Sequence, residues 1–379
     1  MTVQDAPYCG VVEADPRPRE NGANGSRSVP GVASAMRVGR RSLFKASVAA
    51  GSILASLALA EGLVRIFYPH VRDGVVPGRL FEIDQSLGWK LRPGASSVHA
   101  SRYFRAEYAI NDLGFRDGGR RLEKGDDVAH RVLLYGDSQA FGWGVPTQRR
   151  FSNLVEARLP GLEIWNLAVP GYGLDQELLS YEQSGDRFDA DEALLLITVA
   201  TLSRLPYGNI YRKNKPRFDL DSAGSARLVP IRGGANALVR LSYETLSVFS
   251  LPYFVERRLA AARRAVGGGR DKGGASGAAP AVELGDLELA ILERARAKAL
   301  AADHLLTLLV ALPPSWEPAK RSLESFASAR GIGYLEIVVP SEEGYVFGPE
   351  DHHWNERANA LIADQVAAAL GPRRGSTSG

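Results

Sequence analysis

The stretch VLLYGDSQAFGWGV, from Val132 to Val145, decides the fold that we expect for this chain. Four apolar residues run without interruption into Gly136-Asp137-Ser138, and an aromatic, glycine-rich segment follows them. A continuous apolar run is typical of a strand that is covered on both faces, as strands of parallel sheets are. The sequence therefore predicts a buried strand that ends beside a serine, where a helix begins.

Further apolar runs follow along the chain and alternate with amphipathic stretches. The predicted strands after the first are 163–169, 193–199, 305–312 and 334–339. The predicted helices are 152–158, 175–184, 287–302, 318–329 and 356–370. This alternation predicts an α/β fold, a three-layer sandwich with a mostly parallel central sheet. Active sites in such sheets form at the carboxyl ends of the strands.

The first seventy residues differ from the rest in composition. Residues 1–35 are rich in Gly, Pro, Ser, Asn and charge and have no apolar period, so we expect a disordered tail there. Residues 36–70 have the layout of a signal peptide or a membrane anchor. The basic residues that precede the uncharged run 46–60 are Arg37, Arg40, Arg41 and Lys45. Two outcomes stay open, which are cleavage near Ala60 and an uncleaved transmembrane anchor over residues 46–68.

The orientation of this segment follows from its charges. Because the basic residues stand on its N-terminal side, the positive-inside rule puts everything after residue 70 outside the cytoplasm. The run RRSLFK, residues 40–45, is similar to the bacterial twin-arginine export signal. Met36 stands where a signal sequence would start, so translation from Met36 is one hypothesis. We expect a protein that is anchored facing the periplasm or another extracytoplasmic space, or exported there.

Two regions interrupt the alternation of strands and helices. Residues 71–120 hold short extended pieces with glycine turns, which predict a β-rich lead-in. The main domain then covers 121–371, with an insertion at about 204–285 that we expect to cap one side of the sheet and to end in a disordered loop. Residues 372–379 are predicted to form a second disordered tail.

Composition argues against several classes of function. The net charge of +3 over 379 residues, without a basic stripe interleaved with aromatics, argues against nucleic-acid binding. The single cysteine, Cys9, excludes a disulfide within one chain and argues against a cysteine-based zinc site. No Walker-type or Rossmann-type glycine pattern follows a predicted strand, so we expect neither a cofactor nor a metal. The oligomeric state is not specified.

Ser138 has the setting of a nucleophile. It follows a buried strand at the start of a helix, where its backbone N–H can hold an oxyanion at the positive end of the helix. Gly136 is expected to permit the tight turn and Asp137 to cap the helix. A serine hydroxyl is a poor nucleophile alone, so this interpretation requires a base.

The base is expected in the segment GPEDHHWN, residues 348–355. Four of the six histidines lie in the N-terminal regions or before a predicted strand: His70, His99, His130 and His304. The other two, His352 and His353, directly precede the last predicted helix. Either can act as the base, and Asp351 or Glu350 can orient it and stabilise its imidazolium.

Three blocks of the sequence, in this order, resemble the SGNH/GDSL hydrolase family. Gly136-Asp137-Ser138 matches the nucleophile block, NLAVPGYG at 166–173 matches the second block, and DHHWN at 351–355 matches the last block in a variant common in membrane-tethered members. The resemblance spans roughly residues 80–370 and implies a flavodoxin-like sandwich. It implies that Ser138 is the nucleophile, His353 the base and Asp351 its partner. The backbone N–H groups of Ser138 and Gly171 would then bind the oxyanion.

One block departs from the family pattern. The family carries a G-x-N-D segment after the third strand, and its Asn completes the oxyanion hole, but here Ala200 or Thr201 stands at that place. A hydroxyl can replace the amide as donor, and the candidates are Thr198, Thr201 and Ser203. Asn166 is expected either to hold its turn or to contact substrate. Because losing one oxyanion donor costs about 10²–10³ in rate, a non-catalytic binding protein on the same fold is an alternative.

The resemblance implies a serine esterase or O-acyltransferase that works by ping-pong acyl transfer. Tethered members often act on O-acetyl groups of cell-envelope polysaccharides, so an acylated carbohydrate is the expected substrate. The membrane, through residues 46–68, is the other expected partner. A secreted lipase or esterase for small acyl esters is the alternative among enzymes.

Overall fold

The computed structural model describes residues 40–71, 80–118, 121–211, 213–231, 249–266, 283–340 and 344–371. The predicted disordered tails, 1–35 and 372–379, lie outside these residues, and so does the predicted disordered loop of the insertion. Contacts divide the chain into two compact units, Met1–Ser56 and Leu57–Gly379. The boundary falls within helix α1 (Arg40–Phe67).

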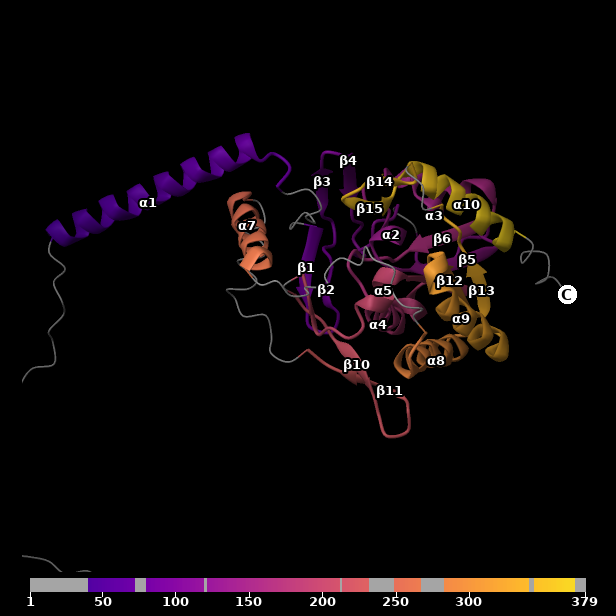
Figure 1. The fold of residues 1–379 in the computed structure, drawn as a ribbon. Helices are drawn as coiled ribbons and strands as arrows, with labels where there is room; N and C mark the ends of the chain where they lie inside the picture. The colour runs from indigo at the N-terminus through magenta and orange to yellow at the C-terminus, as the bar shows by residue number, and fades with distance from the viewer. Residues whose placement is uncertain are drawn as a thin grey trace, which may run out of the picture. The chain divides into compact units, whose positions relative to one another are not determined.

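A five-stranded parallel sheet forms the centre of the second unit (Figure 1). The strands stand in the order β13 (Gly333–Glu336), β12 (Leu305–Ala311), β7 (Glu192–Thr198), β5 (His130–Tyr135) and β6 (Leu162–Asn166). Every pairing between them is parallel. All residues of β7 are buried, and its middle, residues 193–197, is a continuous apolar run, as expected for a strand that is covered on both faces. The prediction of an α/β fold with a parallel central sheet is confirmed.

Helices cover both faces of this sheet. On one side, α3 (Phe151–Arg158) packs against α10 (Glu356–Leu370), and on the other lie α4 (Leu174–Ser184), α8 (Asp286–Ala301) and α9 (Glu317–Arg330) (Figure 1). The five predicted helices agree with these elements to within one residue at each end. The sandwich therefore has three layers, as predicted.

Two predicted strands continue too far. The prediction 163–169 passes the end of β6 at Asn166, and the prediction 334–339 passes the end of β13 at Glu336. Leu167, Ala168 and Val169 are buried, but they lie beyond the edge of the sheet. Apolar residues indicate that a segment is buried, not that it is a strand. After β6 the buried segment continues into the loop that leads toward the candidate site.

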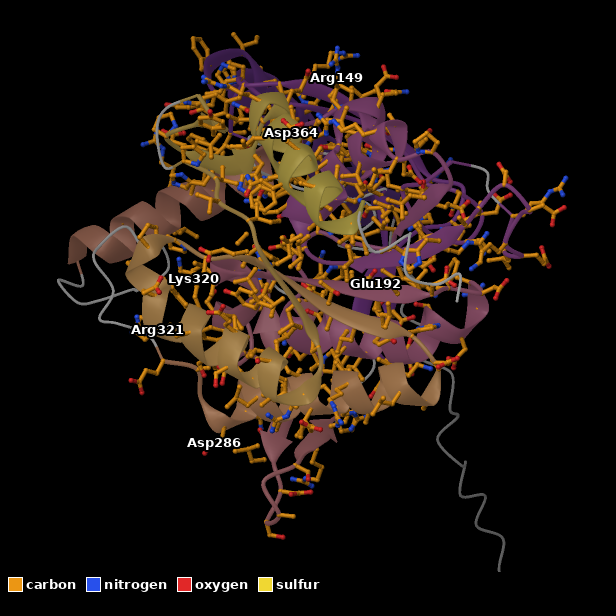
Figure 2. All side chains as sticks on the ribbon, turned by 90° about the vertical axis from the view of Figure 1, so that its right-hand side faces the viewer. Arg149, Glu192, Asp286, Lys320, Arg321 and Asp364 are labelled. Carbon is orange, nitrogen blue, oxygen red and sulfur yellow. The ribbon has the colours of Figure 1, made fainter. Side chains whose placement is uncertain are left out.

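Charged side chains on the surface add ion pairs to this packing (Figure 2). Arg158 on α3 pairs with Asp364 on α10 at 3.1 Å, and Lys320 on α9 pairs with Glu336 on β13 at 2.8 Å. The side chains of Arg158 and Asp364 are 35% and 67% exposed, and a pair so exposed contributes about 0–1 kcal/mol. The layers are therefore held mainly by apolar contacts in the core.

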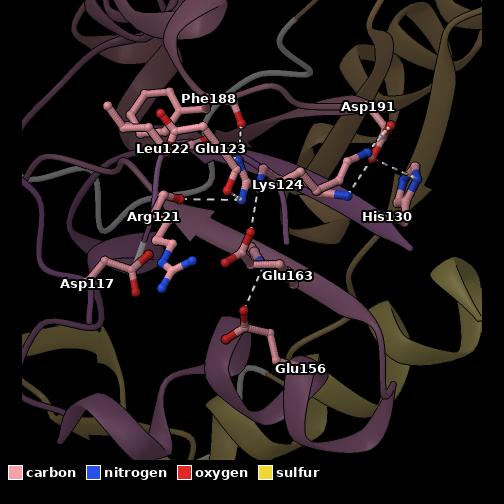
Figure 3. A network of polar contacts seen from close by, with 12 residues as sticks. Asp117, Arg121, Leu122, Glu123, Lys124, His130, Glu156, Glu163, Phe188 and Asp191 are labelled. Carbon is pink, nitrogen blue, oxygen red and sulfur yellow. Dashed lines mark hydrogen bonds and ion pairs between the residues drawn. The ribbon is translucent and has the colours of Figure 1, made fainter. Parts of the chain in front are cut away.

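A polar network ties the amino ends of the strands (Figure 3). Arg131, which is 1% exposed, pairs with Glu163 on β6 at 2.5 Å. Its guanidinium also donates to the carbonyls of Leu122 and Phe188 and, at 3.0 Å, to that of Glu123. These bonds satisfy a buried cation that would otherwise be costly. The network holds the amino edge of the sheet, at the end opposite to Ser138.

Hairpins make up the predicted β-rich lead-in. The two antiparallel pairs are β1 (Phe81–Asp84) with β2 (Gly88–Leu91) and β3 (Ser96–Ala100) with β4 (Arg105–Ala109). Trp89 of β2 donates from Nε1 to the carbonyl of Pro170 at 3.0 Å, and Tyr172 donates to the carbonyl of Trp89 at 2.6 Å. The lead-in thereby supports the loop that carries Gly171.

The described part of the insertion consists of two small hairpins and a helix. These are β8 (Asn209–Ile210) with β9 (Lys213–Asn214), β10 (Arg217–Leu220) with β11 (Ala226–Val229), and α7 (Leu251–Val266). The strand β10 contacts α4 and α8. This hairpin therefore packs on the helical layer that covers one face of the sheet.

Candidate active site

The serine expected as nucleophile begins a short helix at the carboxyl end of β5. The helix α2 (Ser138–Phe141) is capped by Asp137, whose side chain accepts the N–H of Gln139 at 2.9 Å. A Cβ at position 136 would lie 2.6 Å from the Cβ of Ala140 and 3.1 Å from that of Leu196. Glycine is therefore required at 136 by close packing between α2 and β7, since its backbone is not in the left-handed region.

A hairpin brings the expected base to this serine. The strand β15 (Asp351–Trp354) pairs with β14 (Val346–Gly348) directly before α10. Nε2 of His353 lies 2.8 Å from Oγ of Ser138, and Nδ1 of His353 lies 2.6 Å from Oδ1 of Asp351. Three side chains from two distant parts of the sequence thus form one continuous hydrogen-bonded chain.

The structure separates the alternatives that the sequence left open for base and partner. His352 is exposed and its carbonyl, not its ring, faces α2 through a bond from Gln139. Glu350 is 66% exposed at its side chain and lies 3.4 Å from Arg102. Asp351 is 8% exposed and bonds His353 at both its side chain and its backbone N–H.

Electrostatics keep Asp351 ionised. Burial raises the pKa of its carboxyl, but the hydrogen bond and the charge of His353 act in the opposite direction, and the resulting pKa lies below the ordinary value. An ionised carboxylate at Nδ1 stabilises an imidazolium. Trp143 packs on the His353 ring with centroids 5.3 Å apart and covers one of its faces.

Gln139 connects the helix of the serine to the strand of the histidine. Its Oε1 accepts the N–H of Trp354 at 2.9 Å, and its Nε2 donates to the carbonyl of His352 at 3.2 Å. These two backbone groups flank His353 in the sequence, so the bonds restrain the segment that carries the imidazole. The sequence analysis assigned no role to Gln139, because nothing in its spacing marks a contact with a segment so distant along the chain.

Arg204 lies where the third sequence block departs from the family pattern. It follows α5 (Val199–Ser203), the short helix after β7, and is 13% exposed at its side chain. Its Nη1 donates to Oδ2 of Asp137 at 2.9 Å and to the carbonyl of Tyr172 at 2.7 Å. The guanidinium therefore links the turn before Ser138 to the loop of Gly171. The sequence analysis did not single out this residue either.

Gly171 and Asn166 occupy the turn after β6. Gly171 has a φ of 88°, and a Cβ there would lie 3.1 Å from the ring of Tyr211 and 3.2 Å from that of Trp89, so only glycine fits. Asn166 is 1% exposed, and its amide donates to the carbonyl of Ala140 at 2.7 Å. Of the two roles considered for Asn166, its contacts are those of a residue that holds the turn.

Of the three hydroxyls expected to replace the missing Asn, that of Thr198 accepts the N–H of Thr201 at 3.1 Å, and the other two donate to nearby backbone carbonyls. Thr201 is fully buried, and its Oγ1 donates to the carbonyl of Thr198 at 3.0 Å. Oγ of Ser203 donates to the carbonyl of Ala200 at 3.3 Å. Each of these hydroxyls has one proton, and a backbone carbonyl takes it, so the expectation that Thr201 donates to an oxyanion does not fit its hydrogen bonding. Thr201 instead caps α5 together with Thr198.

Comparison with known proteins gives a distant likeness. No family model and no curated protein matches the chain. Solved structures match it. They include G-D-S-L family proteins and esterases. Among them are a lipolytic protein of the G-D-S-L family from Veillonella parvula, the psychrotrophic esterase EstA from Pseudoalteromonas sp., and a variant of the acetyl xylan esterase Axe2 from Geobacillus stearothermophilus.

The numbers show how distant this likeness is. The three structures are, in that order, 12%, 11% and 10% identical to this chain, with TM-scores of 0.34, 0.38 and 0.36. They cover 64%, 65% and 65% of this chain and 98%, 100% and 96% of their own lengths. The protein from Veillonella parvula is described as a member of the G-D-S-L family, which the three sequence blocks also resemble. The activity of this chain has to be inferred from its own residues.

The side chains at this edge of the sheet can move one proton, from Ser138 to His353, while Asp351 stays ionised. The imidazole of His353 can accept the hydroxyl proton of Ser138, while the carboxylate of Asp351 balances the charge that forms. Within the ranges that the structure describes, no group of three or more His, Cys, Asp or Glu side chains could hold a metal ion.

Proposed function

We propose that this chain is an SGNH-type serine esterase or O-acyltransferase that acts on an ester-linked acyl group. The observation that carries the proposal is the hydrogen-bonded chain from Ser138 Oγ through His353 to Asp351, with distances of 2.8 and 2.6 Å. Ser138 also stands at the start of a helix at the carboxyl edge of a parallel sheet, where reacting groups are commonly placed.

The mechanism has two halves. Oγ of Ser138 attacks the carbonyl carbon of the ester while Nε2 of His353 takes its proton, and Asp351 stabilises the imidazolium. We assign the backbone N–H groups of Ser138 and Gly171 to the tetrahedral oxyanion. When that intermediate collapses, His353 gives the proton to the leaving alcohol and an acyl ester remains on Ser138. Water or an acceptor alcohol then attacks this ester by the same steps and releases an acid or a new ester.

We assign the acyl group as acetyl and the substrate as an extracytoplasmic carbohydrate. A small acyl group is supported by close packing around the nucleophile, since Ser138 is 6% exposed and the neighbouring Trp143 is 2% exposed. The helix α1 is long and apolar enough to cross a membrane, although a signal sequence has the same properties. With its basic residues on the N-terminal side, such a helix would put the catalytic residues outside the cytoplasm.

The nucleophile is tested with the purified full chain and a fluorophosphonate probe, read by peptide mass spectrometry. We expect phosphonylation of Ser138, and none in Ser138→Ala or His353→Ala. Ser203→Ala is the matched control, because Ser203 is an exposed serine near the same edge, and it should label like the unmodified chain. A folded protein that does not label at Ser138 would refute the proposal and favour a non-catalytic binding protein.

The substrate class is tested with a series of p-nitrophenyl esters and with acetylated oligosaccharides. We expect acetyl esters to be cleaved faster than octanoyl esters, whereas the reverse order would favour a lipase. Free acetate as the product identifies a hydrolase. Acetate transferred to an added oligosaccharide, detected as a gain in its mass, identifies an O-acyltransferase.

A further inference from the structure

The helix α7 is basic and amphipathic, and its apolar face is exposed. Leu251, Val255, Leu259 and Ala262 follow the spacing of one helical stripe, and Val255 and Leu259 are 45% and 53% exposed. The helix carries four arginines and one glutamate in sequence, so it is cationic. An exposed apolar stripe on a cationic helix is the composition of segments that bind membrane surfaces.

The start of α7 is attached to the end of the candidate membrane helix. Glu61, in the last two turns of α1, accepts the N–H of Ser250 at 2.8 Å and that of Leu251 at 2.8 Å. Arg65 donates to the same carboxylate at 2.7 Å. These bonds satisfy both Glu61 and the first amides of α7, which lowers the cost of placing the carboxylate where water is scarce.

Aromatic and cationic contacts continue this attachment over the next two turns. The rings of Tyr68 and Phe254 have centroids 4.7 Å apart. The guanidinium of Arg258 lies over both rings, at 5.3 and 5.2 Å, and donates to the hydroxyl of Tyr68 at 3.2 Å. The first half of α7 is therefore held at the level where α1 ends.

We propose that α7 lies in the membrane–water interface at the outer end of α1, with Val255 and Leu259 toward the acyl chains and its arginines toward anionic phospholipid headgroups. This inference rests on the proposed extracytoplasmic placement and on α1 being an uncleaved membrane span rather than a signal sequence. A helix that starts at the polar end of a span begins in the headgroup region. An amphipathic helix in that region buries its apolar face at the acyl boundary, and its cations meet the negative surface potential.

The test uses the full chain, with Cys9→Ser, reconstituted in vesicles of phosphatidylcholine and phosphatidylglycerol. Single cysteines carry a nitroxide label in the variants Val255→Cys and Leu259→Cys, and in Arg257→Cys as the control with an exposed polar residue. Collision rates with oxygen, which concentrates in lipid, and with a water-soluble nickel chelate report the surroundings of each label. Ile53→Cys, on an exposed side chain of α1, reports the span itself.

We expect labels at positions 255, 259 and 53 to collide more often with oxygen than with the nickel chelate, and the label at 257 to do the opposite. When phosphatidylglycerol is left out, collisions with the nickel chelate should increase at 255 and 259. If labels at 255 and 259 collide mainly with the nickel chelate while the label at 53 collides mainly with oxygen, the inference is overturned, but α1 is still a membrane span. Labels shielded from both reagents would show that protein covers the stripe, which also overturns it. A label at 53 that collides mainly with the nickel chelate would show that α1 does not span the membrane, which overturns the inference. Reaction of Ser138 with the fluorophosphonate probe tests the catalytic proposal separately.

Discussion

Ser138 and His353 are linked by one hydrogen bond across 215 sequence positions, and Asp351 is bonded to the far side of the imidazole. The sequence alone was enough to select these three residues as candidates. A serine after a buried strand and a histidine beside an acid are recognisable in the sequence, and parallel topology brings such ends to one edge. Their catalytic roles remain predictions. Gln139 and Arg204 were not predictable, since their bonds depend on which loops meet in space.

Asp351→Asn removes the charge that balances the imidazolium and keeps the size of the side chain. We expect kcat for p-nitrophenyl acetate to fall about 10⁴-fold with little change in KM. Glu350→Gln is the matched control, because Glu350 is exposed and contacts Arg102 instead. Steady-state kinetics check both variants. Equal activity of the two would contradict the role assigned to Asp351, which is to stabilise the imidazolium of His353.

Arg204→Lys keeps the positive charge beside Asp137 and tests whether the link from Arg204 to the Tyr172 carbonyl positions the loop of Gly171. A lysine can still pair with Asp137, but its single ammonium is not expected to reach the Tyr172 carbonyl in the same geometry. We expect kcat/KM to fall about 10²-fold with a nearly unchanged melting temperature, since small misplacement of a catalytic loop has costs of that order. Tyr211→Phe, which removes only a 3.3 Å contact to Arg204, should stay close to the unmodified activity. A Lys variant with full activity would show that the loop needs no bridge.

At the scale of elements, long helices and buried strands follow from the sequence and short ones do not. The predicted helices match because apolar residues recur with helical spacing over successive turns. The helices α2 and α5 have four and five residues, which is too few for any period to appear. They are nevertheless the elements that carry Ser138 and precede Arg204. The parts of the fold nearest the candidate site are thus the hardest to predict.

Gln139→Ala removes both bonds between α2 and β15 without touching the serine or the histidine. We expect kcat to fall about tenfold or more while the fold is retained, because the backbone on both sides of His353 loses its restraint. Gln139→Glu keeps the acceptor for the Trp354 N–H and loses the donor to His352, so its activity should lie between the two. Kinetics and thermal melting on the same samples check this order.

At the scale of the whole molecule, one buried acid should dominate the dependence of stability on pH. Glu177 on α4 is fully buried, and neither of its carboxylate oxygens has a hydrogen-bond partner among the described residues. Burial, together with the nearby charge of Asp137, raises its pKa well above the ordinary value, although Arg204 acts in the opposite direction. The folded protein therefore holds a proton that the unfolded chain releases.

Because the unfolded chain binds fewer protons, the free energy of unfolding falls as pH rises from the ordinary glutamate pKa toward the raised one. Within that window the contribution of Glu177 is about 1.4 kcal/mol per pH unit. Glu177→Gln, neutral in both states, should flatten the dependence by that amount, as measured by urea unfolding over a pH series that starts at the ordinary glutamate pKa and rises from there. The same exchange at the exposed Glu324 should change nothing. If the Glu177→Gln variant keeps the slope of the unmodified chain, the prediction is wrong.

The strand β5 connects the polar network at the amino edge of the sheet to the candidate site at the carboxyl edge. Arg131 lies at its start, inside the polar network of Figure 3, and Ser138 follows its other end, about 20 Å away at the rise of a strand. The loops that carry Ser138 and Gly171 can therefore vary in sequence with little effect on the network that holds the opposite edge of the sheet. Under the proposed function, such variation would change which ester is accepted, while Arg131 would preserve a chain that still folds.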